Sequence, residues 1–361
     1  MKHILFAIGS LQGGGAERVV SVWTSALAKK GYKVSVLVYA RHENEYPIDP
    51  NVGVYTIAES VKACNDMPMI ERLRCFRKIL KVQKPDVIIS FLPEVQVYVA
   101  LASIGLRIPR IETVRNNPWK EKVLKTKFAK LWLWCFYSCK AIIVQSEDQK
   151  TFFKNSVQEK AVVIPNPVNP QYIENEKKEY AETKKIVAAG RLAEQKNPKM
   201  MIDAVKLLSQ RYKDVTLEIY GIGTLQEELD AYIKEQKLTD KVFLMGRNDA
   251  LYNVYKQADA YVMSSDYEGM PNALVEAMAV GLPCVSTDCK TGPRDLIDDG
   301  KNGFLVPCGD YKALAEKLER IVLMSAKERM TLGKNARNKI ITFCGEENSL
   351  NRLISVIEGI I

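Results

Sequence analysis

The sequence predicts an α/β protein with two doubly wound, Rossmann-like domains. Short apolar runs alternate with amphipathic stretches along all 361 residues. Near-continuous apolar strands separated by helices are typical of parallel sheets that helices cover on both faces. The stretch from Ile164 to Pro170 contains three prolines, which can continue neither a strand nor a helix. The polar run 171–185 follows it, so the sequence predicts a domain boundary near residue 168.

The N-terminal domain, residues 1–168, is expected to have a strand at each of its apolar runs. An amphipathic helix follows the first run and covers residues 16–30. It is expected to end at Gly31, because a glycine just after the last periodic residue stops a helix. The expected strands lie at residues 4–8, 34–38, 52–57, 86–90, 110–114, 141–145 and 161–164.

The C-terminal domain, residues 169–361, repeats this alternation, and its last helix is a candidate for packing back on the N-terminal domain. Helices are expected to begin near Pro198 and at Pro271, since proline suits the first helical position. The expected strands lie at residues 185–190, 215–220, 241–245, 260–264, 282–286 and 303–306. Ligands are expected at the carboxyl ends of the strands, in the cleft between the two domains.

Composition excludes several classes of protein. An apolar fraction of 47% and a charged fraction of 26% indicate a folded globular chain. The apolar run at the N-terminus stops at Gly9, which favours a first strand over a signal peptide. No run approaches the roughly 18 apolar residues of a membrane span. The eight cysteines form no C-x-x-C pair, so we expect their thiols to be reduced and buried. Reduced thiols in turn indicate a cytoplasmic protein.

The net charge of +9 is concentrated in the N-terminal half. Residues 62–84 hold seven basic side chains against two acidic ones, and residues 115–140 hold seven against one. A basic surface confined to one half indicates a polyanionic partner, either lipid headgroups or nucleic acid. No reader motif with interleaved aromatic residues appears, so nucleic acid is not the expected partner.

The segment E268-G-M-P-N-A-L-V-E276 brings two carboxylates to the start of a helix. With Pro271 at the first helical position, the amides of Asn272, Ala273 and the next residue lack partners inside the helix. Such amides bind anions, phosphate above all. Glu268 and Glu276 would repel a phosphate, so they are better suited to accept hydrogen bonds from hydroxyls on either side of it. The pattern favours a nucleotide joined to a sugar; the alternative is an ordinary helix with two solvated acids.

Two further loops follow strands and could contact such a ligand. Gly13, Gly14 and Gly15 allow close approach of a ligand after the first strand, although the loop is not the G-x-G-x-x-G of dinucleotide-binding proteins. Arg191 and Lys196 follow the first strand of the C-terminal domain and could hold a diphosphate, Arg191 by a bidentate contact. Solvated loop charges are the alternative explanation.

These motifs, in this order, resemble the family 4 glycosyltransferases, retaining enzymes with the two-domain GT-B fold. The resemblance covers nearly the whole chain. It rests on the glycine loop before A16-E-R18, on G190-R-L192 with Lys196, on the Glu-seven-residues-Glu signature and on the turn Gly281-Leu282-Pro283. Any one of these motifs is only weak evidence for the family, whereas all of them in this order are strong evidence for it.

The resemblance implies that the C-terminal domain binds a nucleotide sugar and the N-terminal domain binds the acceptor. Arg191 and Lys196 would hold the donor diphosphate, Glu268 would contact the transferred sugar, and these three are the expected catalytic residues. Glu276 would bind the ribose hydroxyls. The expected donor-binding residues are Gly14, Gly15, Gly190, Tyr220, Gly221, Arg247, Gly269, Met270, Pro271, Asn272, Ala273 and Glu276. The expected acceptor-binding residues are Arg18, Arg74, Lys78, Lys81, Arg115 and Asn116.

The sequence departs from the family at one position. Many members place a histidine near the sugar, from the N-terminal domain, but the corresponding region here reads E112-T-V-R-N-N-P-W119 and contains none. Arg115 or Asn116 is the candidate replacement. The chain also lacks a D-x-D motif and any cluster with metal-ligand spacing, so neither a metal nor another cofactor is expected.

The function expected from these features is retaining transfer of a hexose or N-acetylhexosamine from a nucleotide sugar to a saccharide acceptor. By family resemblance UDP is the expected nucleotide, with GDP-mannose second. A GT-B epimerase would need its own acid and base at the sugar ring, and a binding protein of this fold would not need the full set of charged residues. Both remain alternatives.

The basic segments favour an acceptor on a polyprenyl diphosphate at the cytoplasmic face of a membrane. Arg74, Lys78 and Lys81 recur at helical spacing, with Arg77 and Lys84 close beside them, and could grip a carrier diphosphate. The expected apolar side of this helix consists of Leu73, Phe76, Ile79, Leu80 and Val82. The segment from Trp119 to Tyr137 mixes lysines with tryptophans, a composition suited to an anionic membrane surface. Ordinary surface helices with solvated charge are the alternative.

Overall fold

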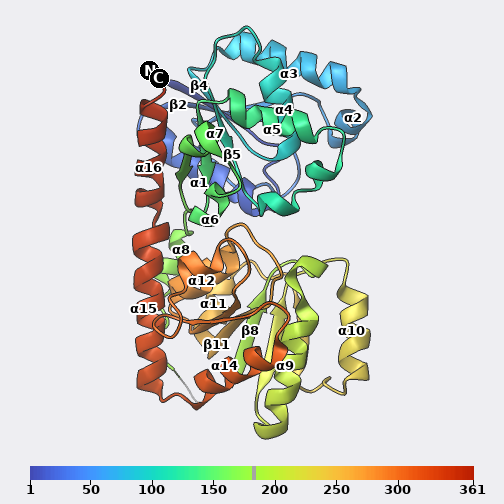
Figure 1. Cartoon of the computed structure of the whole chain (residues 1–361), viewed down its shortest axis with the longest axis vertical. Helices are drawn as coiled ribbons and strands as arrows, with labels where there is room; N and C mark the ends of the chain where they lie inside the picture. Colours follow the sequence, from blue (N-terminus) through green and yellow to red (C-terminus); the bar gives the residue numbers. More distant parts are fainter. Residues whose placement is uncertain (181–183) are drawn as a thin grey trace. The chain divides into compact units, whose positions relative to one another are not determined.

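The structure, a computed structural model, describes residues 1–180 and 184–361. The chain divides into two compact units, one made of residues 1–167 and 347–361 and the other of residues 168–346 (Figure 1). This division differs from a single cut near residue 168, because the last helix belongs to the first unit.

The first unit is built on a sheet in which every pairing is parallel. Its strand order is β3-β2-β1-β4-β5-β6-β7, so the order reverses between β1 and β4. The strands are β1 (His3–Ala7), β2 (Lys33–Val38), β3 (Gly53–Thr56), β4 (Val87–Ser90), β5 (Arg110–Thr113), β6 (Ala141–Val144) and β7 (Ala161–Val163).

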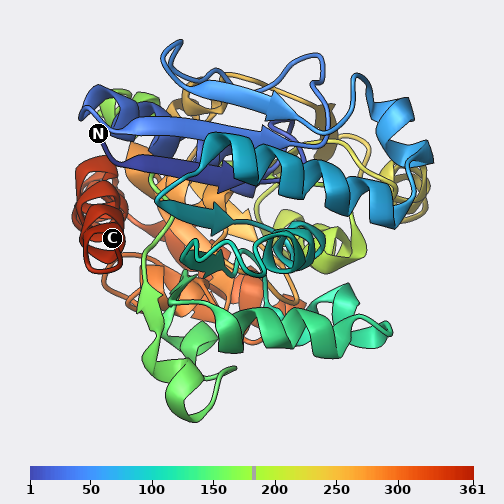
Figure 2. The same cartoon turned by 90° about the horizontal axis from the view of Figure 1, so that it is seen from above.

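Helices cover both faces of this sheet (Figure 2). α1 (Gly15–Lys29) and α16 (Glu346–Glu358) pack on one face, and α3 (Met69–Gln83), α4 (Pro93–Ala102) and α5 (Ala129–Ser138) cover the other. Shorter helices complete the unit: α2 (Val61–Asp66), η1 (Pro118–Lys120), η2 (Lys122–Lys125), α6 (Glu147–Lys150) and α7 (Asn155–Glu159).

The last helix is fixed to the first unit by apolar packing and by a buried polar chain. Leu350, Leu353 and Ile357 lie in the same core cluster as the first strand. Trp23 Nε1 donates to Ser349 Oγ at 3.1 Å, and Ser349 Oγ donates to the carbonyl of Pro165 at 3.0 Å. The apolar side of this amphipathic helix therefore packs against residues far earlier in the chain, including Trp23, whose indole bonds to Ser349 across 326 positions.

The second unit repeats the doubly wound scheme with a parallel sheet of order β10-β9-β8-β11-β12-β13. The order reverses between β8 and β11. The strands are β8 (Lys185–Ala189), β9 (Thr216–Tyr220), β10 (Val242–Gly246), β11 (Ala260–Met263), β12 (Cys284–Thr287) and β13 (Phe304–Val306).

Helices on the two faces of the second sheet belong to two separate apolar clusters (Figure 1). One cluster includes α9 (Pro198–Arg211), α10 (Gln226–Glu235) and α14 (Tyr311–Leu323), and the other includes α8 (Pro170–Glu174), α11 (Leu251–Gln257), α12 (Asn272–Val280) and α15 (Ala326–Cys344). Two short elements, η3 (Glu194–Lys196) and α13 (Pro293–Leu296), follow strands β8 and β12.

The predicted fold class is confirmed, since each expected apolar run contains a strand and both sheets are parallel. In the second unit, two local expectations are wrong. The helix of the two-glutamate segment begins at Asn272, and Pro271 is the residue before it. Cys308 is exposed, although the cysteines were expected to be buried. Among the described residues, no helix combines the length and the apolarity that crossing a bilayer requires.

Candidate functional site

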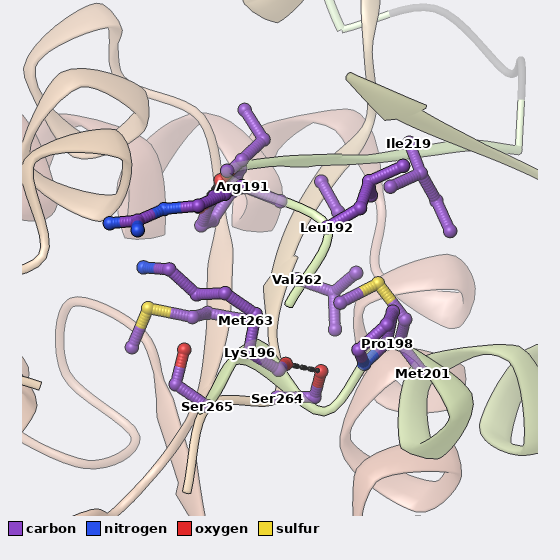
Figure 3. Close-up of a pocket in the computed structure, with 14 residues that line it drawn as sticks. Arg191, Leu192, Lys196, Pro198, Met201, Ile219, Val262, Met263, Ser264 and Ser265 are labelled. Carbon is purple, nitrogen blue, oxygen red and sulfur yellow. Dashed lines mark hydrogen bonds between the residues drawn. The ribbon is translucent and has the colours of Figure 1, made fainter. Parts of the chain in front are cut away.

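The carboxyl ends of β8 and β11 meet where the strand order of the second sheet reverses, the usual ligand position in open α/β sheets. A cavity of about 20 Å³ lies there. It is lined by Ala188, Ala189, Gly190, Arg191, Leu192, Lys196, Pro198, Met201, Ile219, Tyr261, Val262, Met263, Ser264 and Ser265 (Figure 3). This volume is close to that of one water molecule, so the cavity has room for a water but not for a larger ligand.

Two of the expected catalytic residues form an ion pair at this position. Lys196 Nζ lies 2.5 Å from Glu268 Oε1, and Ser265 Oγ donates to the same oxygen at 2.7 Å. The Glu268 side chain is only 7% exposed, whereas that of Lys196 is 26% exposed. Arg191 extends beside Lys196 in the same direction (Figure 3). A charge-assisted bond of this kind fixes the lysine on its flexible stem.

Hydrogen bonds to two other elements, η3 and the end of β12, hold the segment between Ser264 and Glu268. The Ser264 hydroxyl donates to the carbonyl of Lys196 at 2.9 Å, and the Gln195 amide donates to the carbonyl of Tyr267 at 2.8 Å. Thr287 Oγ1 donates to the carbonyl of Ser265 at 2.6 Å. The loop carrying Glu268 is therefore bonded to η3, which follows β8, and to the end of β12.

Thr291 and Gly292 hold the next part of this loop. The buried Thr291 hydroxyl donates to the Glu268 carbonyl, although its backbone has φ +75°, which is rare for a β-branched residue. Gly292 has φ +89°, and a Cβ there would lie 2.4 Å from the Gly269 carbonyl and 2.8 Å from Pro271 Cδ. The contact between the two loops therefore requires a glycine at 292 and keeps Thr291 in a strained conformation.

The start of α12 presents backbone amides without a side-chain cap. Pro271 precedes the helix with φ −77° and ψ 95°. Backbone amides at the positive end of a helix dipole can bind an anion where no side chain caps them. Glu276 lies in the second turn and is buried. Burial raises the pKa of the Tyr261 hydroxyl, and Glu268 and Glu276 both raise it further, so both carboxylates lie within electrostatic reach of that hydroxyl.

Gly190, Tyr220 and Gly221 lie together at the ends of β8 and β9. The Gly190 amide donates to the Tyr220 carbonyl at 2.9 Å, and the Gly221 amide donates to the Gly246 carbonyl at 2.7 Å. A Cβ on Gly221 would lie 1.9 Å from the Gly190 carbonyl oxygen, so only glycine fits. The Tyr220 hydroxyl donates to Glu218 at 2.7 Å.

Arg247 lies on the surface after β10, where its Nε donates to Asp249 at 2.9 Å. Met270 is buried, and Ala273 is half-buried in the first turn of α12. The expected donor-binding residues of the second unit thus fall on the carboxyl ends of neighbouring strands and on the start of α12.

The glycine loop of the first unit precedes α1, as expected. Gly14 caps the helix without a side-chain hydrogen bond, and Gly15 is its first residue. The Glu17 carboxylate lies over Gly14, since a Cβ on Gly14 would be 1.9 Å from Glu17 Oε2. A carboxylate at the start of a helix interacts favourably with the positive end of the helix dipole. Arg18 follows in the first turn and is half-buried.

Arg115 and Asn116 follow β5, at the carboxyl edge of the first sheet. The Arg115 guanidinium lies 4.7 Å from the Trp23 ring centre and 4.8 Å from that of Phe91, and it donates to Asn166 Oδ1 at 3.1 Å. Burial lowers the pKa of Arg115 to about 9. Arg115 therefore packs within its own unit, against two aromatic rings, and Asn116 is half-buried next to it.

The basic stripe on α3 is partly confirmed. Arg74, Lys78 and Lys81 are exposed. Arg77, expected beside them, donates instead to the carbonyls of residues 102 and 104, at the end of α4, at 2.8 Å each. Val82 was expected on the apolar side but is 67% exposed.

The tryptophans near residue 130 do not form one exposed surface. Trp132 is 2% exposed, and its Nε1 donates to Gln96 Oε1 at 2.7 Å. Trp119 is half-buried, with its ring centre 5.4 Å from that of Phe152. Trp134 is 39% exposed. The expectation of a tryptophan-rich interface is therefore wrong for Trp132, which belongs to the core.

Sequence reasoning missed Ser265 and Thr291, which bond directly to Glu268. Ser265 follows a strand at the point where the sheet order reverses, a signal that could have identified it. Thr291 lies 23 residues from Glu268, and no pattern in the sequence marks it. Among residues 1–180 and 184–361, no group of three or more His, Cys, Asp or Glu side chains is arranged to hold a metal ion.

Two family profiles match consecutive parts of the chain. The profile described as "Glycosyltransferase Family 4" matches residues 13–172, and that described as "Glycosyl transferases group 1" matches residues 171–339.

Two curated relatives are similar over most of their length. One is the Campylobacter jejuni GalNAc-alpha-(1->4)-GalNAc-alpha-(1->3)-diNAcBac-PP-undecaprenol alpha-1,4-N-acetyl-D-galactosaminyltransferase, 31% identical, with 95% of each chain covered. The other is the Escherichia coli UDP-Gal:alpha-D-GlcNAc-diphosphoundecaprenol alpha-1,3-galactosyltransferase, 27% identical, with 80% of this chain and 78% of the relative covered.

Solved structures share the fold at low sequence identity. A point mutant of Staphylococcus aureus TarM in complex with fondaparinux, alpha-GlcNAc-glycerol and UDP has a TM-score of 0.82 at 15% identity, with 99% of this chain and 100% of that chain covered. Anabaena HepE in complex with UDP and glucose has a TM-score of 0.80 at 20% identity, with 98% and 99% covered. The two Rossmann-like units are those of the GT-B fold, and the chain belongs to the family 4 glycosyltransferases.

Proposed function

We propose that this glycosyltransferase moves a hexose or N-acetylhexosamine, with retention of configuration, from a UDP sugar to a saccharide on a polyprenyl diphosphate. The observation that carries the proposal is the pairing of Lys196 with Glu268 beside Arg191, ahead of the uncapped start of α12. This arrangement offers cations and amides to a diphosphate and a carboxylate to the attached sugar.

Two kinds of protein group stabilise the negative charge of the donor diphosphate. Arg191 and Lys196 supply fixed positive charge, and the amides of α12 supply aligned dipoles. Both act most strongly on charge that develops as the sugar–phosphate bond breaks. Glu268 accepts from sugar hydroxyls, and Glu276 from the ribose. The E. coli relative is named for a UDP sugar, which supports UDP as the nucleotide.

The proposed reaction is a front-face substitution, in which the acceptor attacks the sugar from the side that the diphosphate leaves. The bond between the anomeric carbon and the phosphate oxygen breaks, and its electron pair stays on the UDP. The acceptor hydroxyl forms the new bond on the same face of the sugar, and its proton passes to the leaving phosphate oxygen. No protein base is needed, because the leaving group accepts the proton.

The acceptor assignment rests on the relatives and on α3. Both relatives described above are named for acceptors on diphosphoundecaprenol. Arg74, Lys78 and Lys81 form an exposed cationic stripe that spans about 10 Å of helix, long enough to contact a diphosphate. A lipid-linked acceptor implies that the enzyme acts at a membrane surface, on the cytoplasmic side where nucleotide sugars are made.

A product assay tests the proposal. Purified protein is given a panel of UDP and GDP sugars with a synthetic saccharide on polyprenyl diphosphate, and the first-formed product is examined by mass spectrometry and proton NMR. We expect transfer from one α-linked UDP sugar with an α product. An inverted product would contradict retention, and conversion of the donor without acceptor would favour the epimerase.

The reaction is expected to proceed in excess EDTA. The reason is that Arg191 and Lys196, rather than a divalent cation, neutralise the leaving diphosphate in this proposal. Initial rates are compared with and without EDTA and with added Mg²⁺ or Mn²⁺. Complete loss of activity that Mg²⁺ restores would show that a metal ion takes part.

Thr291→Val is expected to lower kcat by about 10- to 100-fold with little change in the donor KM. Valine has the same shape but cannot donate to the Glu268 carbonyl, and small displacements of reacting groups cost rates of this order. Thr291→Ser keeps the hydroxyl and should retain near wild-type kinetics. Equal kcat values in the two variants would mean that the hydrogen bond has no part in positioning Glu268.

A further inference from the structure

The two cations of the donor site differ in whether an acid neutralises them. Arg191 is exposed and, in the described parts of the chain, no acid pairs with it. Lys196 extends beside Arg191 (Figure 3), and its Nζ is 2.5 Å from Glu268 Oε1. A diphosphate that approaches Lys196 therefore also approaches a carboxylate. Like charges repel each other more strongly where protein replaces water.

The carboxylate of Glu268 is held in place through its side chain and its backbone. Ser265 Oγ donates to Oε1 at 2.7 Å, and the Thr291 hydroxyl donates to the Glu268 carbonyl. Ser265 is itself fully buried, and Thr287 Oγ1 donates to its carbonyl at 2.6 Å. Only 7% of the Glu268 side chain is exposed. A nearby anion therefore meets a carboxylate that is anchored and poorly screened by water.

One oxygen of this carboxylate remains for a ligand. Lys196 and Ser265 both donate to Oε1, and no group of the described residues donates to Oε2. In the proposed donor complex, a sugar hydroxyl donates to Oε2. That hydrogen bond to a charged acceptor is stronger than one to a neutral acceptor, and it offsets the repulsion between Glu268 and the donor diphosphate.

Sugar transfer changes what this carboxylate faces. Before transfer, the terminal phosphate of the donor is esterified to the sugar and carries one negative charge. After transfer, it is the free end of UDP, and a terminal phosphate loses its second proton with a pKa of about 6. Near pH 7 the product therefore gains negative charge at the end next to Glu268, while Oε2 loses its hydroxyl partner.

We propose that Glu268 makes the donor site discriminate between the nucleotide sugar and the UDP that remains after transfer. The carboxylate tolerates the intact donor, whose sugar bonds to it, and repels the more highly charged product, which promotes product release. The inference rests on the proposed function, because it requires the diphosphate of a UDP sugar at Lys196 and the sugar at Glu268. It gives Glu268 a second task besides the contact with the sugar.

The test is Glu268→Gln, which removes the charge and keeps the shape of the side chain. Calorimetric titration should show that UDP binds the variant about 10-fold more tightly than wild type, or about 1.4 kcal/mol. One charge near a protein surface has an effect of this size. The UDP sugar that supports transfer should bind no more tightly than to wild type, because the variant also loses the charged hydrogen bond to the sugar. Glu268→Ala, a second variant without the charge, should tighten UDP binding in the same direction.

Glu194→Gln is the matched control. Glu194 is exposed, lies in η3 two residues before Lys196, and has no ion-pair partner among the described residues. The variant loses the same charge without changing the pair at Lys196, so it should bind UDP like wild type. Uridine is a second control, because it lacks the diphosphate. Its affinity, measured by displacement of UDP, should be equal in Glu268→Gln and wild type.

Three results would overturn the inference. UDP affinity that is equal in wild type and both Glu268 variants would show that the carboxylate does not repel the product. An equal gain in affinity for UDP and for the UDP sugar would show repulsion without discrimination, and a gain for uridine would indicate a change in the shape of the site. In each case the transfer assay decides separately on the proposed function. Wild-type protein that binds neither UDP nor a UDP sugar would contradict the proposed donor itself.

Discussion

Lys196→Ala is expected to lower kcat by about 100- to 1,000-fold, or about 3–4 kcal/mol of transition-state stabilisation. Negative charge grows on the diphosphate as the glycosidic bond breaks, so a cation there acts more strongly in the transition state than in the bound donor. The substitution also leaves Glu268, which is 7% exposed, without the partner that lies 2.5 Å away. Steady-state kinetics with saturating acceptor measure the effect.

Lys199→Ala provides the control for this prediction. Lys199 lies one residue after the start of α9, and its Nζ pairs with Glu228 at 2.6 Å, so the same charge is lost from an exposed ion pair. Its kinetics should stay close to wild type, since exposed pairs contribute little. Glu276→Ala should instead raise the donor KM, because the ribose contact is made alike in the ground and transition states. Wild-type kinetics in both Lys196→Ala and Glu276→Ala would show that the donor site lies elsewhere.

Reversal of Arg74, Lys78 and Lys81 to glutamate is expected to abolish transfer to a polyprenyl-diphosphate-linked acceptor while donor hydrolysis continues. The exposed stripe then repels the carrier diphosphate that it is proposed to hold. Binding to anionic vesicles should also fall, and wild-type binding should weaken as salt rises because exposed charges are screened. Transfer and hydrolysis are followed in parallel by product chromatography.

A charge-retaining triple variant, Arg74→Lys with Lys78→Arg and Lys81→Arg, should keep transfer. It separates charge from the packing of α3, whose buried side carries Phe76 and Leu80. Undiminished transfer by the glutamate variant, together with wild-type protein that ignores anionic vesicles, would make a soluble acceptor the better assignment.

The sequence by itself determined the alternation of strands and helices, the parallel sheets and the order of the donor motifs. These features depend on local patterns. A continuous apolar run predicts a strand buried on both faces, and glycine or proline marks where an element ends. The positions of Arg191, Lys196 and Glu268 after strands followed from the same patterns, because parallel strands bring their carboxyl ends to one edge.

Only the tertiary structure decided which side chains meet. Lys196 and Glu268 are 72 residues apart, and their pairing depends on β8 lying next to β11. The strained Thr291 reaches the Glu268 carbonyl through a loop contact that requires Gly292. Such contacts depend on how elements distant in the sequence pack, and no local period encodes that packing.

The same limit explains the incorrect expectations on the basic half. Helical spacing placed Val82 on the apolar side and Arg77 beside the cationic stripe, but the neighbouring α4 decides which side of α3 is covered. Trp132 looked like part of a membrane surface and instead bonds to Gln96 in the core. A helix sequence gives its period, whereas the direction of its buried face is set by the elements that pack against it.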